Sequence, residues 1–131
     1  MTSPTTETAD AAGAATLAAV ERFNAAFARH DVEGVMAAMT DDCVFENTSP
    51  APDGTRHVGQ AAVRAAWAGF FAGSPGARFE TEEVFAAGDR CVVRWTYRWA
   101  ADGAGPGHVR GVDLFRVRDG KVAEKLSYVK G

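Results

Sequence analysis

The chain has 131 residues, of which 47% are hydrophobic and 24% are charged. This length supports one folded domain with its own core, and the composition is ordinary for a globular protein. The net charge of −3 predicts no basic surface, so we expect no nucleic-acid partner. The apolar stretches are short and interrupted by charged residues, so we also expect no membrane-spanning segment.

Residues 1–15 are rich in Thr and Ala and contain no Lys or Arg. They lack the basic start and apolar stretch of a secretory signal, so we predict a disordered tail before a single domain over residues 16–131. The two cysteines, Cys43 and Cys91, lie in apolar surroundings, and we expect buried free thiols rather than a disulfide. Together these features favour a cytoplasmic protein.

The first half of the predicted domain has helical periodicity. A first helix over residues 16–29 places its large apolar side chains on one face: Leu17, Val20, Phe23 and Phe27. Asp31 is a suitable N-cap for a second helix, and residues 59–71 repeat the helical pattern. Between these helices we predict a short strand over residues 43–47 and a loop over residues 49–54.

From residue 78 onward, the apolar pattern changes to a period of two. We predict strands over residues 78–87, 90–100, 108–118 and 121–130, joined by turns at residues 88–89, 101–107 and 118–120. Because consecutive strands joined by short turns usually pair antiparallel, these four form a meander. The predicted fold class is therefore α+β, with three helices packed on one face of an antiparallel sheet.

The strand over residues 108–118 has one face that is apolar except for Asp113. The other residues on that face are Val109, Gly111, Phe115 and Val117. A carboxylate among apolar side chains pairs, takes up a proton or takes part in chemistry, because burying an unpaired charge costs much free energy. Asp113 is therefore the first candidate for a functional residue.

The partner of Asp113 depends on the turn at residues 118–120. A three-residue loop with a bulge and a left-handed Gly120 would place Lys125 opposite Asp113. A two-residue primed turn at Asp119 and Gly120 would place Leu126 there and turn Lys125 to the other face. We favour the three-residue loop, because it gives the carboxylate a cross-strand partner.

Aromatic side chains share one side of the strand over residues 90–100, where Trp95, Tyr97 and Trp99 alternate with polar residues. Large rings with polar tips suit the wall of a pocket that orients an apolar ligand between sheet and helices. The three histidines have no spacing typical of metal ligands, so we expect no metal site, and we expect no cofactor.

The order of elements and three segments resemble the nuclear transport factor 2-like superfamily, and within it the SnoaL-like and ketosteroid-isomerase-like branch. The segments are Met39–Asn47, Arg56–Gly59 and Val112–Val122, and the resemblance covers about residues 16–130. It implies a cone of three helices on a curved antiparallel sheet (a cystatin-like roll) with a deep apolar pocket, often a homodimer through the outer sheet face. The superfamily includes isomerases, polyketide cyclases, dehydratases, an epoxide hydrolase and non-catalytic binders.

The resemblance carries over only part of a known active site. The general base of the steroid isomerases falls at Asn47 and their oxyanion-hole tyrosine at Phe23, and neither residue can play that role. Their oxyanion-hole aspartic acid matches Asp113, which is also the counterpart of the acid–base aspartate of polyketide cyclases. The last-strand aspartate of the epoxide hydrolase falls at Ser127, so that reaction is disfavoured.

These inferences combine into one pocket hypothesis. Asp113 and Lys125 are the candidate catalytic residues, with Asp113 as acid or base and Lys125 tuning its charge state or stabilising an enolate oxygen. A Schiff base on Lys125 would need a lowered pKa, and the nearby carboxylate opposes this. The expected substrate contacts come from Phe23, Phe27, Asn47, Trp67, Trp95, Tyr97, Ser127 and Val129.

The leading functional hypothesis is a cofactor-free isomerase, cyclase or dehydratase that performs acid–base chemistry on an apolar carbonyl compound, polyketide- or steroid-like. The alternative is a non-catalytic module for hydrophobic-ligand binding or dimerisation, in which Asp113 and Lys125 only satisfy one another as an ion pair. In either case the expected partners are a small apolar molecule and a second copy of the chain.

Overall fold

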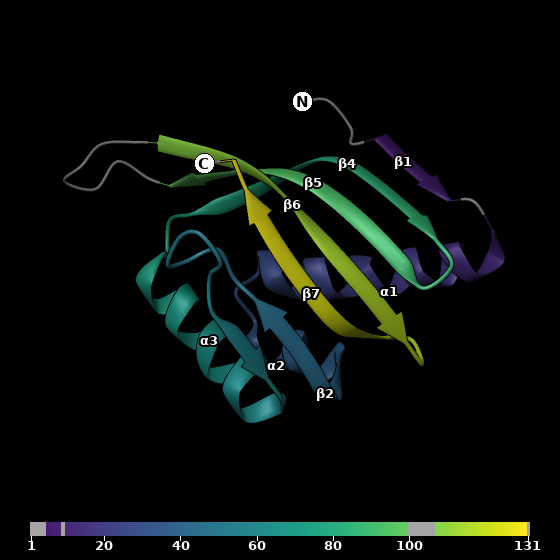
Figure 1. Ribbon diagram of the computed structural model, residues 1–131, viewed down its shortest axis with the longest axis horizontal. Coiled ribbons are helices and arrows are strands. Elements are labelled where there is room, and N and C mark those ends of the chain that lie inside the picture. Colours follow the sequence, from purple (N-terminus) through teal and green to yellow (C-terminus); the bar gives the residue numbers. More distant parts are fainter. Residues whose placement is uncertain (1–4, 9, 100–106, 131) are drawn as a thin grey trace.

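The computed structural model describes residues 5–8, 10–99 and 107–130. Three helices, α1 (Ala11–Ala28), α2 (Val32–Ala37) and α3 (Gln60–Gly73), lie on one side of a curved sheet (Figure 1). The strands are β1 (Thr5–Thr8), β2 (Met39–Glu46), β3 (Arg56–Val58), β4 (Arg78–Ala87), β5 (Arg90–Trp99), β6 (Gly107–Arg118) and β7 (Lys121–Val129). This arrangement confirms the predicted α+β fold class.

The predicted meander forms the centre of the sheet, whose order is β1-β4-β5-β6-β7-β2-β3. Strands β4 to β7 pair antiparallel with their sequence neighbours, as short turns require. Two parallel pairings extend this meander, because β1 lies beside β4 and β2 lies beside β7. The predicted turn over residues 101–107 lies outside the described residues except for Gly107, which begins β6.

The hydrophobic core fills the space between the helices and the inner face of the sheet. Helix α1 contributes Val20 and Phe23, helix α3 contributes Trp67, and strand β6 contributes Phe115, all of which are at most 1% exposed. The ring of Phe23 contacts those of Trp67 and Phe115 edge-on, at centroid distances of 6.0 and 5.6 Å. The aromatic side chains of α1 thus pack this helix against both α3 and the sheet.

The N-terminal segment differs from the prediction of a disordered tail over residues 1–15. Thr5–Thr8 form β1, and α1 begins at Ala11 rather than at residue 16, so the prediction is wrong for these residues. The helix begins early because the Asp10 side chain accepts a hydrogen bond from the Gly13 N–H and so caps its first turn. Residues 1–4 and 9 lie outside the described part.

The β6–β7 hairpin also differs from the prediction. Asp119 and Gly120 have φ angles of 54° and 74°, which are those of a two-residue primed turn, and not of the favoured three-residue loop. The strand register then shifts between Arg116 and Val117, where Ala123 is left without a cross-strand partner as a bulge. As a result Asp113 lies opposite Ser127, and Lys125 lies opposite Phe115.

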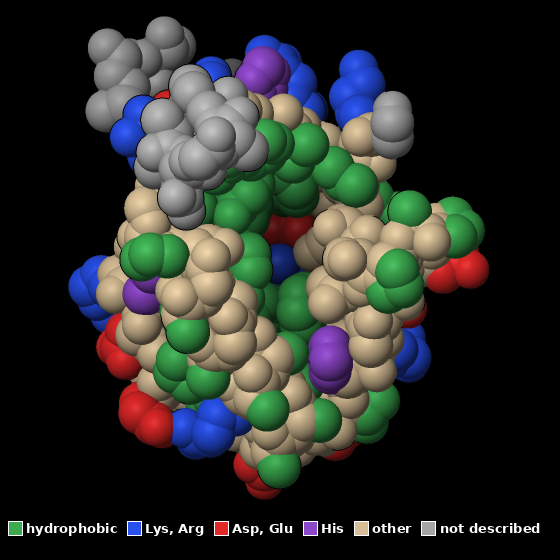
Figure 2. Space-filling model, turned by 90° about the vertical axis from the view of Figure 1, so that its left-hand side faces the viewer, with side chains coloured by type: hydrophobic (Ala, Val, Ile, Leu, Met, Phe, Trp, Pro, Cys, Tyr) green, Lys and Arg blue, Asp and Glu red, His purple; other side chains and the backbone are tan. Residues whose placement is uncertain are grey.

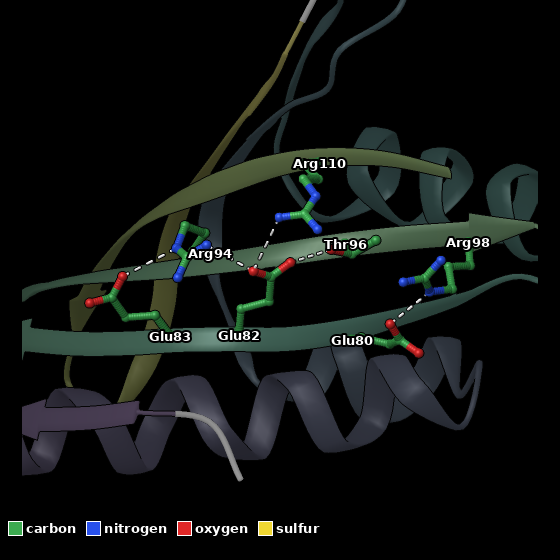
Figure 3. Close-up of polar contacts among 7 residues, drawn as sticks. All are labelled: Glu80, Glu82, Glu83, Arg94, Thr96, Arg98 and Arg110. Atoms are coloured by element: carbon green, nitrogen blue, oxygen red, sulfur yellow. Dashed lines mark hydrogen bonds and ion pairs between the residues drawn. The ribbon is translucent and has the colours of Figure 1, made fainter. Parts of the chain in front are cut away.

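The outer face of the sheet carries cross-strand charge pairs between β4, β5 and β6 (Figure 3). Arg94 contacts Glu82 at 2.8 Å and Glu83 at 3.2 Å, and Arg98 contacts Glu80 at 2.7 Å. These charges are partly exposed, so each pair adds little to the stability of the fold.

The two thiols, Cys43 and Cys91, are buried and unpaired, as expected. No helix in the described part of the chain is long and apolar enough to cross a membrane.

Candidate active-site pocket

One face of the molecule has a hollow with hydrophobic walls, and acidic and basic side-chain atoms are visible at its bottom (Figure 2). The hollow has two lobes that share the side chains of Phe27, Phe70, Phe79, Trp95 and Lys125. We name them the α1 lobe, which also contains residues 24, 28 and 30, and the α3 lobe, which also contains residues 66 and 67. Their volumes are about 140 and 200 Å³.

The floor of the hollow is a three-residue polar network on β6 and β7. Lys125 Nζ donates to Ser127 Oγ at 3.0 Å, and Ser127 Oγ donates to Asp113 Oδ1 at 2.7 Å. Lys125 Nζ also lies 3.4 Å from Asp113 Oδ1, and both charged side chains are only 8% exposed. The acid and the amine therefore meet inside the pocket, and Ser127 bridges them.

The local chain geometry explains this meeting. Residues two apart on a strand share a face, so Lys125 and Ser127 both point to the inner side of β7. A two-residue turn alone would have turned Lys125 outward, but the bulge at Ala123 adds one residue and restores the inward face. Lys125 therefore points inward, as predicted, but through a different turn and a different register.

The ammonium group of Lys125 is surrounded by aromatic rings. Its Nζ atom lies 5.6 Å from the ring centroid of Phe27, 4.9 Å from that of Phe45 and 5.2 Å from that of Trp67. Burial in this apolar site lowers the pKa of Lys125 from its ordinary value of 10.5, although the charge and hydrogen bonding of Asp113 act in the opposite direction.

Most of the predicted substrate contacts lie on the wall of the hollow. Phe27 and Trp95 line both lobes, Tyr97 lines the α1 lobe, and the α3 lobe is lined by Asn47, Trp67 and Ser127. Two of the predicted residues lie elsewhere in the structure. Phe23 lies in neither lobe, because its ring is fully buried in the core behind Phe27 and Trp67. Val129 is the last residue of β7, is 37% exposed and borders an outer groove instead.

Asn47 also has a structural task. Its Oδ1 atom accepts hydrogen bonds from the backbone N–H groups of Thr55, at 2.7 Å, and Ser49, at 3.3 Å. The side chain thereby holds together the two ends of the loop over residues 48–55. In this structure Asn47 therefore anchors a loop.

Sequence reasoning missed several wall residues. Phe45, Phe70 and Phe79 line the hollow, and His30 lines the α1 lobe while its ring stacks on Phe71 at 4.5 Å. The alternation of Cys43 and Phe45 on β2 was a usable signal for Phe45. His30 offered none, because it lies outside the apolar stripe of α1; its φ of 55° belongs to the end of that helix, where its N–H donates to the Phe27 carbonyl and that of Asp31 to the Ala26 carbonyl.

The chemistry of this site is that of an acid–amine pair in an apolar cavity. A carboxylate can move a proton, and a nearby ammonium can stabilise an oxygen that gains negative charge. Over the described residues, no cluster of three or more His, Cys, Asp or Glu side chains could hold a metal ion. The buried indole N–H groups of Trp67 and Trp95 have no hydrogen-bond partner among the described residues.

Comparison with known proteins gives a family and several similar folds. The model of the SnoaL-like domain family matches residues 20–125. An NTF2-like protein of unknown function from Mesorhizobium loti is 43% identical, with a TM-score of 0.81, over 96% of this chain and 99% of that chain. No match was found among curated proteins.

Two further solved structures are similar. The Mycobacterium tuberculosis protein RV0760c, in complex with estradiol-17beta-hemisuccinate, is 27% identical, with a TM-score of 0.73, over 87% of this chain and 92% of that chain. A protein described as a SnoaL-like polyketide cyclase from Jannaschia sp. CCS1 is 21% identical, with a TM-score of 0.79, over 93% of this chain and 90% of that chain. The similarity to the Jannaschia protein, at 21% identity, concerns the fold alone.

Proposed function

The chain belongs to the SnoaL-like domain family, and on this premise we propose that it binds a small apolar carbonyl compound and catalyses a cofactor-free proton transfer on it. The reaction class is isomerisation, cyclisation or dehydration. The observation that supports this proposal is the network of Asp113, Ser127 and Lys125 at the floor of an otherwise apolar hollow.

In the proposed mechanism Asp113 is the general base. Its carboxylate removes a proton from the carbon next to the substrate carbonyl, and the C–H electron pair moves into the carbon–carbon bond as the carbonyl oxygen becomes an enolate. Lys125 stabilises that oxygen by charge and hydrogen bonding, at the floor of the hollow where its side chain is only 8% exposed. Ser127 holds the two groups in place, and Asp113 later returns the proton to the product.

The dimensions of the hollow support a ligand with two ring-sized parts. A cavity of about 150 Å³ holds one benzene molecule, so each lobe accepts about one ring. The steroid ester bound to RV0760c is consistent with a fused-ring or polyketide-like ligand.

The proposal is tested by exchange of the acidic protons of apolar ketones. We would incubate the protein with a panel of one- to three-ring ketones in deuterated water and follow loss of the α-proton signals by NMR. We expect exchange with at least one ketone, and a loss of about 100-fold or more in Asp113→Asn. The control is Asp119→Asn, which removes an exposed carboxylate from the β6–β7 turn. Equal rates in the Asp113 variant and the wild type would contradict the mechanism.

A non-catalytic binding role is the second candidate, and two observations favour it. Phe23 provides no hydrogen-bond donor and lies outside both lobes, and Asn47 is engaged in its loop. A binding protein would be stabilised against heat by the same ketones without turning over any of them. Thermal stabilisation that persists in Asp113→Asn, without proton exchange in the wild type, would support this second role.

We also propose that the chain forms a homodimer through the outer face of β5, β6 and β7. Tyr128 is 50% exposed on this face and lies opposite Val112, with Leu114 two residues further along β6. The nearby Arg94 and Arg110 both pair with Glu82 on β4 (Figure 3). Apolar area between neutralised charges is suited to a self-complementary contact. Light scattering should give a dimer for the wild type and a monomer for Leu114→Arg, with exposed Ala68→Arg on α3 as the control. A monomeric wild type would contradict the proposal.

A cytoplasmic location is proposed as well, because both cysteines are free thiols, as is usual in reducing compartments. Cell fractionation tests it, and recovery of the protein outside the cytoplasm would contradict it.

A further inference from the structure

We propose that the side-chain amine of Lys125 forms a reversible imine with an aldehyde or ketone that enters the pocket. This inference rests on the proposed carbonyl-binding function, because it uses the same cavity. It does not require Asp113 to abstract a proton from carbon, so the two proposals can fail separately.

The position of Lys125 is the first argument. The chain has three lysines, and two of them, Lys121 and Lys130, are exposed to solvent. The Lys125 side chain is only 8% exposed and forms part of the wall of both lobes. A carbonyl compound that occupies either lobe therefore lies beside this amine. The reaction then takes place within a complex, whereas surface lysines react only through bimolecular collisions in solution.

The charge state of Lys125 is the second argument. Asp113 is the charged group in contact with Nζ, at 3.4 Å, and it favours the ammonium form, as do the rings of Phe27, Phe45 and Trp67. The α1 lobe is also lined by His30, Arg78 and Tyr97. Burial outweighs the contribution of Asp113 and lowers the pKa of Lys125, so that more of the nucleophilic free amine is present near neutral pH.

The hydrogen-bond network supplies the proton transfers that imine formation needs. The Nζ lone pair attacks the carbonyl carbon, the carbonyl π electrons move to oxygen, and one proton moves from nitrogen to that oxygen to give a carbinolamine. The hydroxyl group then leaves as water with a further proton from nitrogen, and the carbon–nitrogen double bond forms. Ser127 and Asp113, linked at 2.7 Å, can accept and return these protons next to the reacting nitrogen.

The test is reductive trapping with benzaldehyde, an aromatic aldehyde with a single ring, which matches the size of one lobe. The full-length protein is incubated at pH 7 with benzaldehyde and sodium cyanoborohydride, whose hydride converts an imine into a stable benzylamine. Peptide mapping by mass spectrometry then measures the rate of benzylation at each lysine. We expect Lys125 to react at least about tenfold faster than Lys121 or Lys130, although it is the least exposed of the three.

Three controls make this result specific to the folded pocket. In Lys125→Met the fast adduct should disappear, whereas in Lys121→Met it should remain. In concentrated urea the preference for Lys125 should be lost, because the three lysines then have the same surroundings. If Lys125→Met does not fold, the comparison of the three lysines within the wild-type chain still decides the question.

Benzylation confined to Lys121, Lys130 and the N-terminal amine, with Lys125 unmodified, would overturn the inference. A preference for Lys125 that persists in urea would overturn it too, because the preference would then not come from the pocket. Fast trapping at Lys125 without any ketone proton exchange would support the imine and contradict the mechanism proposed for Asp113.

Discussion

The polar network at the floor of the pocket predicts a large loss of stability when only one of its charges is removed. Lys125→Met removes the ammonium and leaves the Asp113 carboxylate, which is 8% exposed, with Ser127 as its remaining partner. At 3.4 Å and an effective dielectric constant of about 20, the lost attraction is about 5 kcal/mol. Breaking a buried pair in this way costs about 3–5 kcal/mol, and we expect a loss in free energy of unfolding within that range.

Urea denaturation at pH 7, followed by circular dichroism, measures this loss. The matched comparison is the double variant Asp113→Asn with Lys125→Met, in which neither charge remains. The double variant has no unpaired carboxylate. We therefore expect its loss in free energy of unfolding to be about 1–3 kcal/mol smaller than the sum of the losses in the two single variants. The free energy of unfolding of a domain of this size is only about 5–15 kcal/mol, so we expect the Lys125→Met variant to be barely stable.

The reasoning would be refuted if Lys125→Met cost less than about 1 kcal/mol and the double variant equalled the sum of the single variants. That result would mean that the two charges do not interact in the folded state. If Lys125→Met failed to fold, folding of the double variant would support the coupling. If neither Lys125→Met nor the double variant folded while Asp113→Asn did, the loss of stability would come from the lost packing of the lysine side-chain stem instead.

Three further predictions follow from the same structure. The folded-state pKa of Lys125 lies below its ordinary value of 10.5, so the unfolded chain binds more protons than the folded chain between the two pKa values. The free energy of unfolding of the wild type, measured relative to that of the double variant, should therefore rise as pH increases toward 10.5. A fall would contradict the lowered pKa. A methyl group added at Gly111 would lie 2.5 Å from the ring of Trp95. Gly111→Ala should therefore lower the free energy of unfolding, measured in urea, by about 1–3 kcal/mol and weaken ketone binding. Gly69→Ala in α3, where the added methyl group meets open space, should raise the free energy of unfolding by about 0.5–1 kcal/mol. Equal changes in the free energy of unfolding for the two variants would contradict this account. Burial raises the pKa of the Cys91 thiol to about 12, so a thiol reagent at pH 8 should modify Cys91 only after unfolding, and rapid reaction of the native protein would contradict its burial.

Local sequence patterns determined most of the elements and the direction in which the key side chains point. The period of two over β4 to β7 predicted the meander, and the helical stripes predicted the three helices that cover it. The same alternation placed Asp113 on the inner face of β6, because side-chain direction along a strand depends only on position parity. These features are set by neighbours in the chain, which is why they can be read from it.

Tertiary structure decided how the strands meet. A two-residue turn at Asp119 and Gly120, combined with the bulge at Ala123, directs Lys125 inward, as a three-residue loop would, but places Ser127 opposite Asp113. The sequence pattern could not separate these solutions, because a turn and a bulge each shift the register by one residue and their effects add. The parallel pairing of β2 with β7 joins segments about eighty residues apart, and no local signal encodes it. The wall of the pocket, from Phe45 to Ser127, exists only once that pairing has formed.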